Sequence, residues 1–372
     1  MRIVYREQIL KDLRKKMVFI SGPRQVGKTT FSKSLMSVFK NPIYLNYDSA
    51  EDRSIIDKRK WGSHIDLVIL DEIHKKRNWK NYLKGIYDTK PNSLSILVTG
   101  SARLETFRKG GDSLTGRYFS ARMLPFTLSE LKKDSTPCFM EELLERGGFP
   151  EPFFTDSMID RERWRNQYID TMIREEILDF EKVSELRSMQ YLIELLRRRV
   201  GSPISYRNLS EDLSISPNTI KRYIEILESL YIIFRITPFS KRIQRAIQRE
   251  PKLYFFDWNL AEGDGARLEN FAAVHLFKHV LLSNDLLGKR YELGYLRTKD
   301  GKEIDFCISQ KDEIVSAFEI KSSELEASKN CIYFHQKYNL PITQLVRYAR
   351  KESNNKGIPI LPLELGLEKL VL

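Results

Sequence analysis

The segment Met17-Val-Phe-Ile-Ser-Gly-Pro-Arg-Gln-Val-Gly-Lys-Thr-Thr30 carries the most specific pattern in this chain. Its first four residues are apolar and predict a buried strand. The pattern Gly22-x-x-x-x-Gly27-Lys28-Thr29 follows directly, and residues 30–39 then carry apolar side chains at helical spacing. A strand, a glycine-rich loop and a helix in this order are typical of a Walker A motif, whose backbone N–H groups bind phosphate.

The loop predicts a site for a nucleotide and a magnesium ion. Lys28 would reach the β- and γ-phosphates, and the Thr29 hydroxyl would take one position of Mg²⁺. We therefore expect ATP and Mg²⁺ as cofactors, bound by the loop and the helix start: Gly22, Pro23, Arg24, Gln25, Val26, Gly27, Lys28, Thr29 and Thr30. The alternative is a glycine-rich turn before an ordinary helix.

Four more strand-like runs follow at residues 42–47, 64–72, 95–101 and 118–124, with helical stretches between them. Strands that alternate with helices predict a wound α/β domain with a parallel sheet. We place this P-loop core at residues 1–126, with a short helical lead-in over residues 1–16 that would flank the nucleotide base.

Asp71 and Glu72 end the third strand-like run and fit a Walker B motif. In a P-loop fold we expect this strand beside the Walker A strand, so that Asp71 holds Mg²⁺ through water. Glu72 would polarise the attacking water as general base. Apolar strands before Asp-Glu also occur by chance, and the preceding Walker A motif is what favours the functional interpretation.

Two further residues are candidates for the same site. Ser101 closes the fourth run in the sensor position, where a polar side chain can orient the water against the γ-phosphate; a turn residue at a strand end is the alternative. Arg117 precedes the fifth run and could reach a nucleotide in trans as an arginine finger. Arg103 competes for that role, and an ordinary surface arginine is the other interpretation.

Composition limits the class of protein. The length of 372 residues predicts two or three domains. The hydrophobic content of 41% is enough for each domain to have a substantial core. A formal net charge of +12 is compatible with a polyanionic partner, although solubility explains it equally well. Three widely spaced cysteines favour a reducing compartment. No apolar run approaches the ~18 residues that cross a bilayer, and no signal peptide precedes the loop, so we expect a cytoplasmic protein without a membrane partner.

Three regions follow the P-loop core. Residues 127–187 are helical and charged around Gly147-Gly-Phe-Pro-Glu151, and we interpret them as a lid. Residues 188–258 predict helices near 188–200, 207–213 and 218–230, with two strand-like runs after them. Residues 259–372 begin with a helix and continue with strands near 291–297, 303–308 and 313–321.

The motifs together resemble one family. Gly-Pro-Arg-Gln-Val-Gly-Lys-Thr, Leu-Asp-Glu-Ile, Thr-Gly-Ser-Ala, Thr-Gly-Arg, Leu-Pro-Phe-Thr-Leu-Ser-Glu and Gly-Gly-Phe-Pro-Glu occur in this order over nearly the whole chain. The set is similar to the AAA-type ATPases of archaea and bacteria whose C-terminal domain was long described as of unknown function. The Gly-Gly-Phe-Pro stretch resembles the lid proline motif of signal-transduction ATPases, which would put Pro150 near the nucleotide base; a helix-start proline is the alternative.

Residues 206–230 resemble a winged helix-turn-helix. The polar and basic residues of the second helix point away from its apolar face and suit a DNA groove: Asn218, Thr219, Lys221 and Arg222. A basic wing after it would contact phosphates through Lys241, Arg242 and Arg245. A packing or regulatory module is the alternative, and Glu225 and Glu228 dilute the charge of the helix.

The last region carries Asp305 and then Glu319-Ile-Lys321. Within a strand Glu319 and Lys321 project from one face. Asp305 and Glu319 could hold Mg²⁺ or Mn²⁺, with Glu269 completing the metal cluster and Lys321 positioning a hydroxide for attack on a phosphodiester. The order resembles the PD-(D/E)xK nuclease core, and the resemblance implies a restriction-endonuclease-like α/β domain. Alternating charges on an edge strand, or a binding platform without cleavage, are the alternatives.

The sequence therefore predicts an ATPase that acts on DNA through a winged helix and a metal-dependent nuclease-like domain. The rival hypothesis is a slow nucleotide-controlled switch that recruits a protein partner, with a catalytically silent C-terminal domain. A homo-oligomer is compatible with either, and no residue pattern identifies a protein partner. His275 and His279 stand four apart on a helix but lack a His-Glu-x-x-His pattern, so we expect core or boundary histidines and not metal ligands.

Overall fold

The computed structural model describes residues 2–100, 114–131, 139–177, 183–239 and 250–370. Contacts divide the chain into two compact units. The first comprises Met1–Pro125 with Asp285–Leu287, and the second comprises Phe126–Asn284 with Gly288–Leu372. Five residues with a predicted role lie outside the described residues: Ser101, Arg103, Lys241, Arg242 and Arg245.

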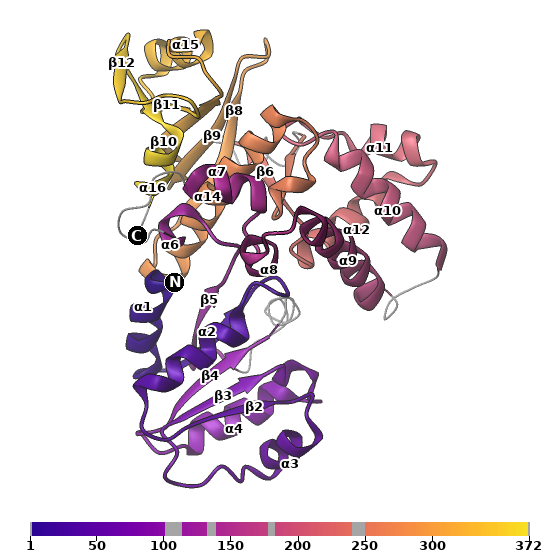
Figure 1. The fold of residues 1–372 in the computed structure, drawn as a ribbon, viewed down its shortest axis with the longest axis vertical. Coiled ribbons are helices and arrows are strands. Elements are labelled where there is room, and N and C mark those ends of the chain that lie inside the picture. The colour runs from indigo at the N-terminus through magenta and orange to yellow at the C-terminus, as the bar shows by residue number, and fades with distance from the viewer. Residues whose placement is uncertain (1, 101–113, 132–138, 178–182, 240–249, 371–372) are drawn as a thin grey trace. The chain divides into compact units, whose positions relative to one another are not determined.

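A five-stranded parallel sheet forms the centre of the first unit (Figure 1). Its strands are β1 Met17–Ser21, β2 Pro42–Asn46, β3 Leu67–Asp71, β4 Ser95–Thr99 and β5 Tyr118–Arg122. The helices are α1 Ile3–Leu13, α2 Lys28–Leu35, α3 Ala50–Lys58 and α4 Trp79–Thr89, with single turns at Met36–Val38 and Ile73–Lys75. Every residue of β1, β3 and β4 is buried, as parallel strands covered on both faces require. The predicted wound α/β fold is confirmed.

The order of the strands corrects one expectation. The sheet runs β2-β3-β4-β1-β5, so β4 separates the Walker B strand β3 from the Walker A strand β1, and the expected adjacency is wrong. A hydrophobic run predicts a strand, but it carries no information about which neighbour that strand takes. The parallel register nevertheless ends the three strands at one edge, because Thr99 is opposite Ile20 on one side and Asp71 on the other.

The second unit begins with helices. Their bounds are α6 Leu128–Leu131, α7 Phe139–Arg146, α8 Pro150–Phe154, α9 Met158–Ile177, α10 Val183–Arg197, α11 Tyr206–Leu213 and α12 Pro217–Ser229. Pro150 and Pro217 each stand in the first turn of a helix, where the missing N–H has no intrahelical partner to lose. The Ser205 and Ser216 hydroxyls cap α11 and α12 by accepting backbone N–H groups. The expected helix–turn–helix segment is therefore present as two capped helices.

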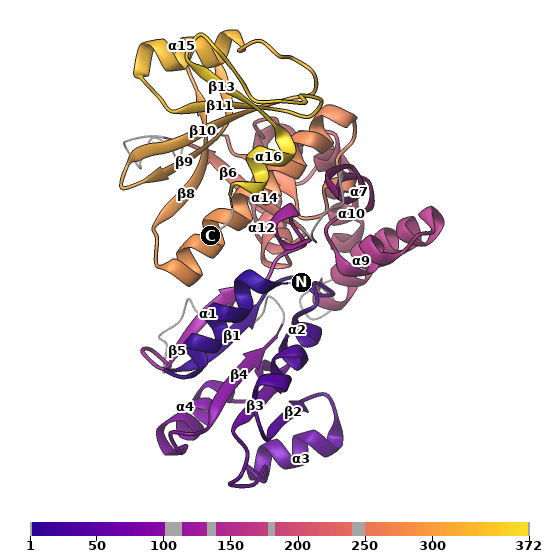
Figure 2. The same cartoon turned by 60° about the vertical axis from the view of Figure 1, so that its left-hand side comes forward.

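An eight-stranded sheet completes the second unit, in the order β12-β13-β11-β10-β9-β8-β6-β7. The strands are β6 Ile233–Pro238, β7 Lys252–Phe255, β8 Tyr291–Arg297, β9 Glu303–Gln310, β10 Glu313–Lys321, β11 Ile342–Val346, β12 Ser353–Asn355 and β13 Ile358–Pro362. The helices are α14 Asp264–Leu287, α15 Lys329–Tyr338 and α16 Leu363–Glu368, with a single turn at Trp258–Leu260. Helix α15 packs against β9, β11 and β13 (Figure 2).

Strands β6 and β7 connect the helical region to this sheet. They form an antiparallel pair, and β6 also pairs in parallel with β8. The strands that the sequence places after the helix-turn-helix therefore belong to the same sheet as the C-terminal strands. Strand β7 is an edge strand, and the Asn270 side chain of α14 binds both the N–H and the C=O of Phe255. This pair of bonds satisfies the backbone of Phe255 on this edge strand, whose residues are all buried, and fixes α14 against β7.

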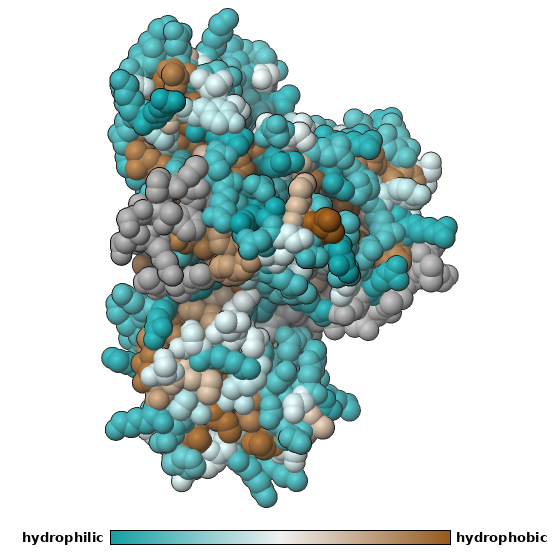
Figure 3. Space-filling view, in the orientation of Figure 1, coloured by the Kyte–Doolittle hydropathy of each residue, from teal (hydrophilic) through white to brown (hydrophobic). Residues whose placement is uncertain are grey.

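The surface is mainly hydrophilic on the face shown in Figure 3, with hydrophobic side chains in small separate groups. The exposed large hydrophobic residues include Phe154, Met158 and Ile159 around the start of α9. Within the described ranges, we find no helix with the length and apolar character that a membrane span requires.

Candidate functional site

The Walker A loop joins β1 to α2 and needs its two glycines for different reasons. Gly22 has φ of 142°, and a Cβ there would lie 2.0 Å from the Met123 carbonyl oxygen. Gly27 has φ of 91° and precedes the first residue of α2. Both conformations disfavour residues with a side chain, so the loop is shaped by positions that only glycine tolerates.

Lys28 is held inside this loop. Its ammonium donates to the carbonyl oxygens of Gly22 at 3.0 Å and Pro23 at 2.5 Å, and the residue is 8% exposed. Burial lowers the pKa of Lys28 to about 8, although the nearby Glu72 and Asp71 carboxylates oppose this shift. The ammonium is therefore poorly solvated, and a phosphate oxygen in the loop would be a better partner than the two carbonyls.

Asp71 is the centre of a hydroxyl cluster at the strand ends. Its carboxylate accepts hydrogen bonds from Thr29 at 2.8 Å, Tyr44 at 2.7 Å and Thr99 at 2.5 Å. The two residues predicted at the magnesium ion, Thr29 on α2 and Asp71 at the end of β3, are thus brought together although β4 lies between β1 and β3. Sequence reasoning missed Tyr44 and Thr99. Thr99 lies inside the fourth predicted run, two residues before the expected end at Ser101, and the strand in the structure ends at Thr99 itself.

Glu72 lies next to this cluster in an unusual backbone conformation. Its φ is 56°, in the left-handed region that residues with a side chain rarely adopt. The carboxylate lies 3.5 Å from His74 Nε2 and 3.6 Å from Lys75 Nζ. Burial raises the pKa of Glu72, and Asp71 adds to the effect while Lys75 opposes it. A carboxylate with a raised pKa is better suited to accept a proton near neutral pH.

The other predicted residues of the nucleotide site differ in where they lie. Arg24, Gln25 and Thr30 lie on or beside the loop, and Val26 is buried with its carbonyl bound by Arg2. Arg117 precedes β5, at the opposite edge of the sheet from the loop, and pairs with Asp88 at 2.8 Å. Its action in trans stays a prediction. Pro150 begins α8 in the second unit, so its placement near the nucleotide base also stays a prediction.

A second cluster lies in the C-terminal sheet. Asp305 on β9 accepts the backbone N–H of Ile320 at 2.8 Å, beside Glu319 on the antiparallel strand β10. Lys321 Nζ lies 2.9 Å from Glu319 Oε1. Burial and then the charge of Asp305 raise the pKa of Glu319 to about 7. The predicted Asp305, Glu319 and Lys321 are therefore brought together.

Glu269 joins this cluster through residues that the sequence analysis did not single out. Tyr254 donates to Glu269 Oε1 at 2.8 Å, and Lys252 Nζ lies 3.3 Å from the same oxygen. Lys252 also pairs with Glu303 at 2.6 Å. Burial and then Asp305 raise the pKa of Glu269 to about 7. No sequence motif marks Lys252 or Tyr254, since β7 precedes α14 and reaches the cluster only through the fold.

One carboxylate oxygen of this cluster fits a hard divalent cation. Glu319 is 3% exposed, and its Oε2 is buried with no hydrogen-bond partner among the residues that the structure describes. A buried carboxylate oxygen without a donor is costly unless a cation meets it. Over the same residues, no group of three or more His, Cys, Asp or Glu side chains is placed to hold a metal ion. Asp305 and Glu319 therefore form the candidate pair, with water in the other positions.

The helix-turn-helix region presents its predicted residues as expected from the helical period. Ile220, Tyr223, Ile224 and Leu227 are buried on one face of α12. Asn218, Lys221 and Arg222 are exposed, and Thr219 shares a hydrogen bond with Ser216 at 2.9 Å. His275 lies in the core, where it is buried and accepts the N–H of Leu128. His279 is half-buried and bonds to the carbonyl oxygen of Leu370, so the two residues match the predicted core or boundary positions.

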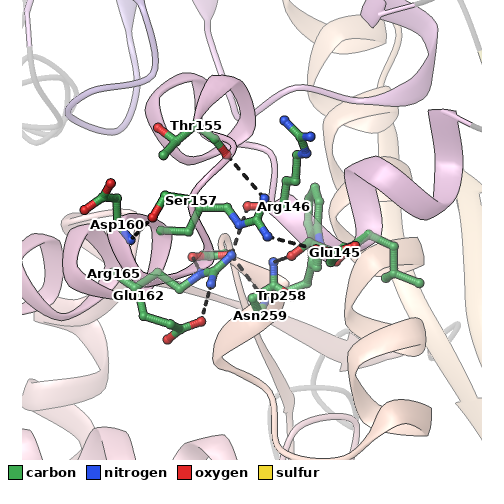
Figure 4. A network of polar contacts seen from close by, with 12 residues as sticks. Glu145, Arg146, Thr155, Ser157, Asp160, Glu162, Arg165, Trp258 and Asn259 are labelled. Carbon is green, nitrogen blue, oxygen red and sulfur yellow. Dashed lines mark hydrogen bonds and ion pairs between the residues drawn. The ribbon is translucent and has the colours of Figure 1, made fainter.

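A polar network ties the predicted lid helices to the segment after β7 (Figure 4). Arg165 on α9 binds Asp257 Oδ2 at 3.2 Å and the carbonyl oxygen of Arg146 on α7 at 2.9 Å. Trp258 donates to the carbonyl of Leu144 at 3.0 Å. The strand that supplies Lys252 and Tyr254 to the carboxylate cluster is thus anchored to α7 and α9.

Comparisons with known proteins divide the chain in three. Residues 14–132 match the family model described as an AAA domain. The first unit carries a P-loop domain of the AAA type. Residues 139–262 and 264–365 match two domains of unknown function, DUF8612 and DUF4143. The predicted AAA-type core is confirmed, and so is the presence of a C-terminal domain of a family of unknown function.

The similar proteins extend over most of the chain. An uncharacterized protein of Methanocaldococcus jannaschii is 24% identical over 87% of this chain and 81% of its own length. An uncharacterized protein of Mycobacterium tuberculosis is 24% identical over 66% of this chain, which spans only 55% of that longer protein. The Walker-type ATPase of Pyrococcus abyssi is 15% identical, with a TM-score of 0.43, over 69% of this chain and 93% of its own.

Proposed function

We propose that this chain binds and hydrolyses ATP with Mg²⁺ and acts on DNA as a metal-dependent phosphodiesterase. The observation that carries the ATPase half is the hydrogen bond between Thr29 and Asp71 beside the buried ammonium of Lys28. A hydroxyl and a carboxylate from the Walker A and Walker B motifs meet there, which is what Mg²⁺ on a nucleotide requires. In this proposal residues 1–126 are the ATPase core and residues 127–187 a lid.

Four residues of the AAA domain have assigned roles in this mechanism. Lys28 would exchange its carbonyl partners for phosphate oxygens, and Thr29 and Asp71 would hold the magnesium ion. Mg²⁺ would neutralise charge that develops on the γ-phosphate. Glu72 would accept a proton from the attacking water, and its raised pKa favours that transfer near neutral pH.

The phosphodiesterase half of the proposal rests on the carboxylate cluster of residues 259–372, which we interpret as a PD-(D/E)xK-like domain. Asp305 and Glu319 would hold Mg²⁺ or Mn²⁺, and the buried Glu319 Oε2 without a donor supports this assignment. The cation would supply Lewis-acid chemistry toward a phosphodiester. Lys321 would steady the negative charge that develops on the phosphate, since its ammonium already lies 2.9 Å from Glu319.

DNA contact by residues 188–258, interpreted as a winged helix, completes the proposal. Lys221 and Arg222 on α12 are exposed, and the apolar face of that helix is fully used in packing. Exposed cations near the start of such a helix suit phosphates and base edges. A nucleotide-controlled switch with a silent C-terminal domain is the competing function, and a buried unpaired carboxylate oxygen favours a cation site over that account.

Cleavage of DNA by the full chain tests the proposal. Linear, branched and single-stranded DNA would be digested with Mn²⁺ or Mg²⁺, with and without ATP. Asp305→Ala should abolish cleavage and leave ATP hydrolysis near the wild-type rate, because the two sites are built from different residues. Asp312→Ala, an exposed aspartate of the β9–β10 turn, is the matched control and should cleave normally. Equal digestion by wild type and Asp305→Ala would favour the switch.

A further inference from the structure

Lys252 is a buried cation for which no motif of this chain assigns a role. It is the first residue of β7 and is 1% exposed. Its ammonium lies 2.6 Å from Glu303 Oε1 and 3.3 Å from Glu269 Oε1, and 5.3 Å from the ring centroid of Tyr295. A lysine is rarely buried this deeply unless it is paired, so these carboxylates are what keep it charged.

Glu269 is restrained from more than one side. Tyr254 and Lys252 both act on Oε1. On another side the backbone of Gly201 closes on the carboxylate, because a Cβ on Gly201 would lie within 2.7–2.8 Å of both oxygens. The carboxylate is therefore fixed by a phenol, an ammonium and a close backbone. Glu319 differs, since its Oε2 has no partner in the described part of the chain.

We propose that Lys252 is a positioning residue that holds Glu269 out of the coordination of a divalent cation and leaves Asp305 and Glu319 as the direct ligands. The inference rests on the proposed metal site and refines its ligand set. Its physical basis is that Glu269 is held by both an ammonium and a phenol on Oε1. Glu319 also has an ammonium beside Oε1, from Lys321, but it keeps a buried Oε2 without a partner in the described part of the chain. Without Lys252, Glu269 would lose its ammonium partner and keep the neutral Tyr254 hydroxyl, so a divalent cation held by Asp305 would attract this carboxylate.

Binding of Mn²⁺ to the full-length chain without nucleotide or DNA tests this role. Lys252→Met removes the charge and keeps the length of the side chain. We expect the Kd for Mn²⁺, measured by titration calorimetry, to fall at least tenfold, because a repulsive charge is removed and a third carboxylate is released. Lys252→Arg keeps the charge and should stay within about threefold of wild type. Asp305→Asn should abolish binding and thereby assign the heat to this site. An unchanged Kd in a folded Lys252→Met protein would overturn the inference.

Glu269 provides the second arm, which does not depend on Lys252→Met folding. Glu269→Gln in the wild-type background should change the Kd for Mn²⁺ by less than about threefold, whereas Glu319→Gln should abolish binding. In the Lys252→Met background the same Glu269→Gln change should remove the gain in affinity. If Glu269→Gln alone weakens Mn²⁺ binding as much as Glu319→Gln does, then Glu269 is a direct ligand and the inference is wrong.

Thermal unfolding without metal gives a readout of the pairing itself. Lys252→Met should lower the Tm, and Lys252→Met with Glu269→Gln should recover part of the loss, since one of the two carboxylates that lost the ammonium is then neutral while Glu303 still lacks it. No recovery would mean that Lys252 does not hold Glu269. A failure of the proposed function looks different: no variant, Lys252→Met included, would then bind Mn²⁺, and the metal site and this inference would be refuted together.

Discussion

Single side chains decide how the proposed magnesium-binding edge of the AAA domain is built. Asp71 is 5% exposed and is satisfied by three hydroxyls, of which the Thr99 hydroxyl lies nearest. We expect Thr99→Val to lower the free energy of unfolding by about 1–3 kcal/mol, because it leaves a buried carboxylate oxygen short of a donor. Thr89→Val, at an exposed threonine of α4, is the control and should cost less than about 0.5 kcal/mol in the same urea titration. Equal losses would contradict the assigned role of Thr99.

His275 links stability to pH. It is buried on α14, and burial lowers its pKa to about 3 from an ordinary 6.5. Since the folded protein binds this proton less well than the unfolded chain, the contribution of His275 is complete above pH 6.5 and is lost as the pH falls toward 3. The difference in unfolding free energy between wild type and His275→Gln should therefore shrink by about 2 kcal/mol between pH 6.5 and pH 5. A difference that stays flat over this pH range for His275→Gln would refute the linkage.

Among the site residues, the sequence predicted those that stand in motifs and missed those that join a site only through the fold. Thr29 and Asp71 were expected together because the Walker A and Walker B patterns carry that pairing. Tyr44 and Lys252 were not, since each lies at an ordinary strand position and meets its carboxylate only after the strands are ordered. A local pattern has no means of showing such partners.

Among the elements, the contact between α9 and the segment after β7 carries a definite stability prediction (Figure 4). Asp257 and Arg165 are 4% and 6% exposed, respectively. Asp257→Asn should lower the free energy of unfolding by about 2–3 kcal/mol, because Arg165 then keeps its charge in a buried place with a weaker partner. Glu162→Gln removes the exposed partner of the same arginine and should cost about 0.5 kcal/mol or less in the same urea titration. If the two variants lose the same stability, burial does not set the strength of this pair.

Element prediction succeeded where the hydrophobic period was long and unbroken. The strands β1 to β5 and β8 to β10 and the helices α11 and α12 follow such runs. No helix or strand was predicted after residue 321. In that part of the chain β12 has only 3 residues, and β11 is a short run interrupted by Thr343 and Gln344. Short strands of this kind are stabilised by pairing in the sheet and not by their own pattern. The prediction that β3 lies beside β1 was wrong for the same reason, because tertiary structure decides which strands pair.

For the whole molecule, charge is distributed unevenly. Residues 1–125 contain 25 Lys and Arg against 12 Asp and Glu, whereas residues 126–372 contain 37 against 38. The net charge of +12 therefore comes from the AAA unit and not from the region of the proposed winged helix or nuclease-like domain. The overall basic balance does not by itself support DNA contact by α12, and only its local cations do.

The dependence of DNA affinity on salt concentration tests whether α12 contacts DNA. Replacing Lys221 and Arg222 together by Ala should weaken DNA binding and reduce the salt slope of log K by about two units, since each lost phosphate contact releases one counterion fewer. Replacing the exposed Lys311 and Lys356 together removes the same charge from the second unit and should leave the slope unchanged. The same slope in both double variants would assign α12 to packing alone.

ATP turnover by Glu72→Gln is the sharpest test of the proposed ATPase, because the variant keeps the shape of the side chain and removes the base. Steady-state hydrolysis with Mg²⁺ would be measured beside ATP affinity for wild type, Glu72→Gln and Lys28→Ala, with the exposed Lys40→Ala as control. We expect wild-type affinity and at least a hundredfold slower turnover for Glu72→Gln, lost affinity for Lys28→Ala, and wild-type behaviour for Lys40→Ala. Equal turnover in wild type and Glu72→Gln would contradict the account.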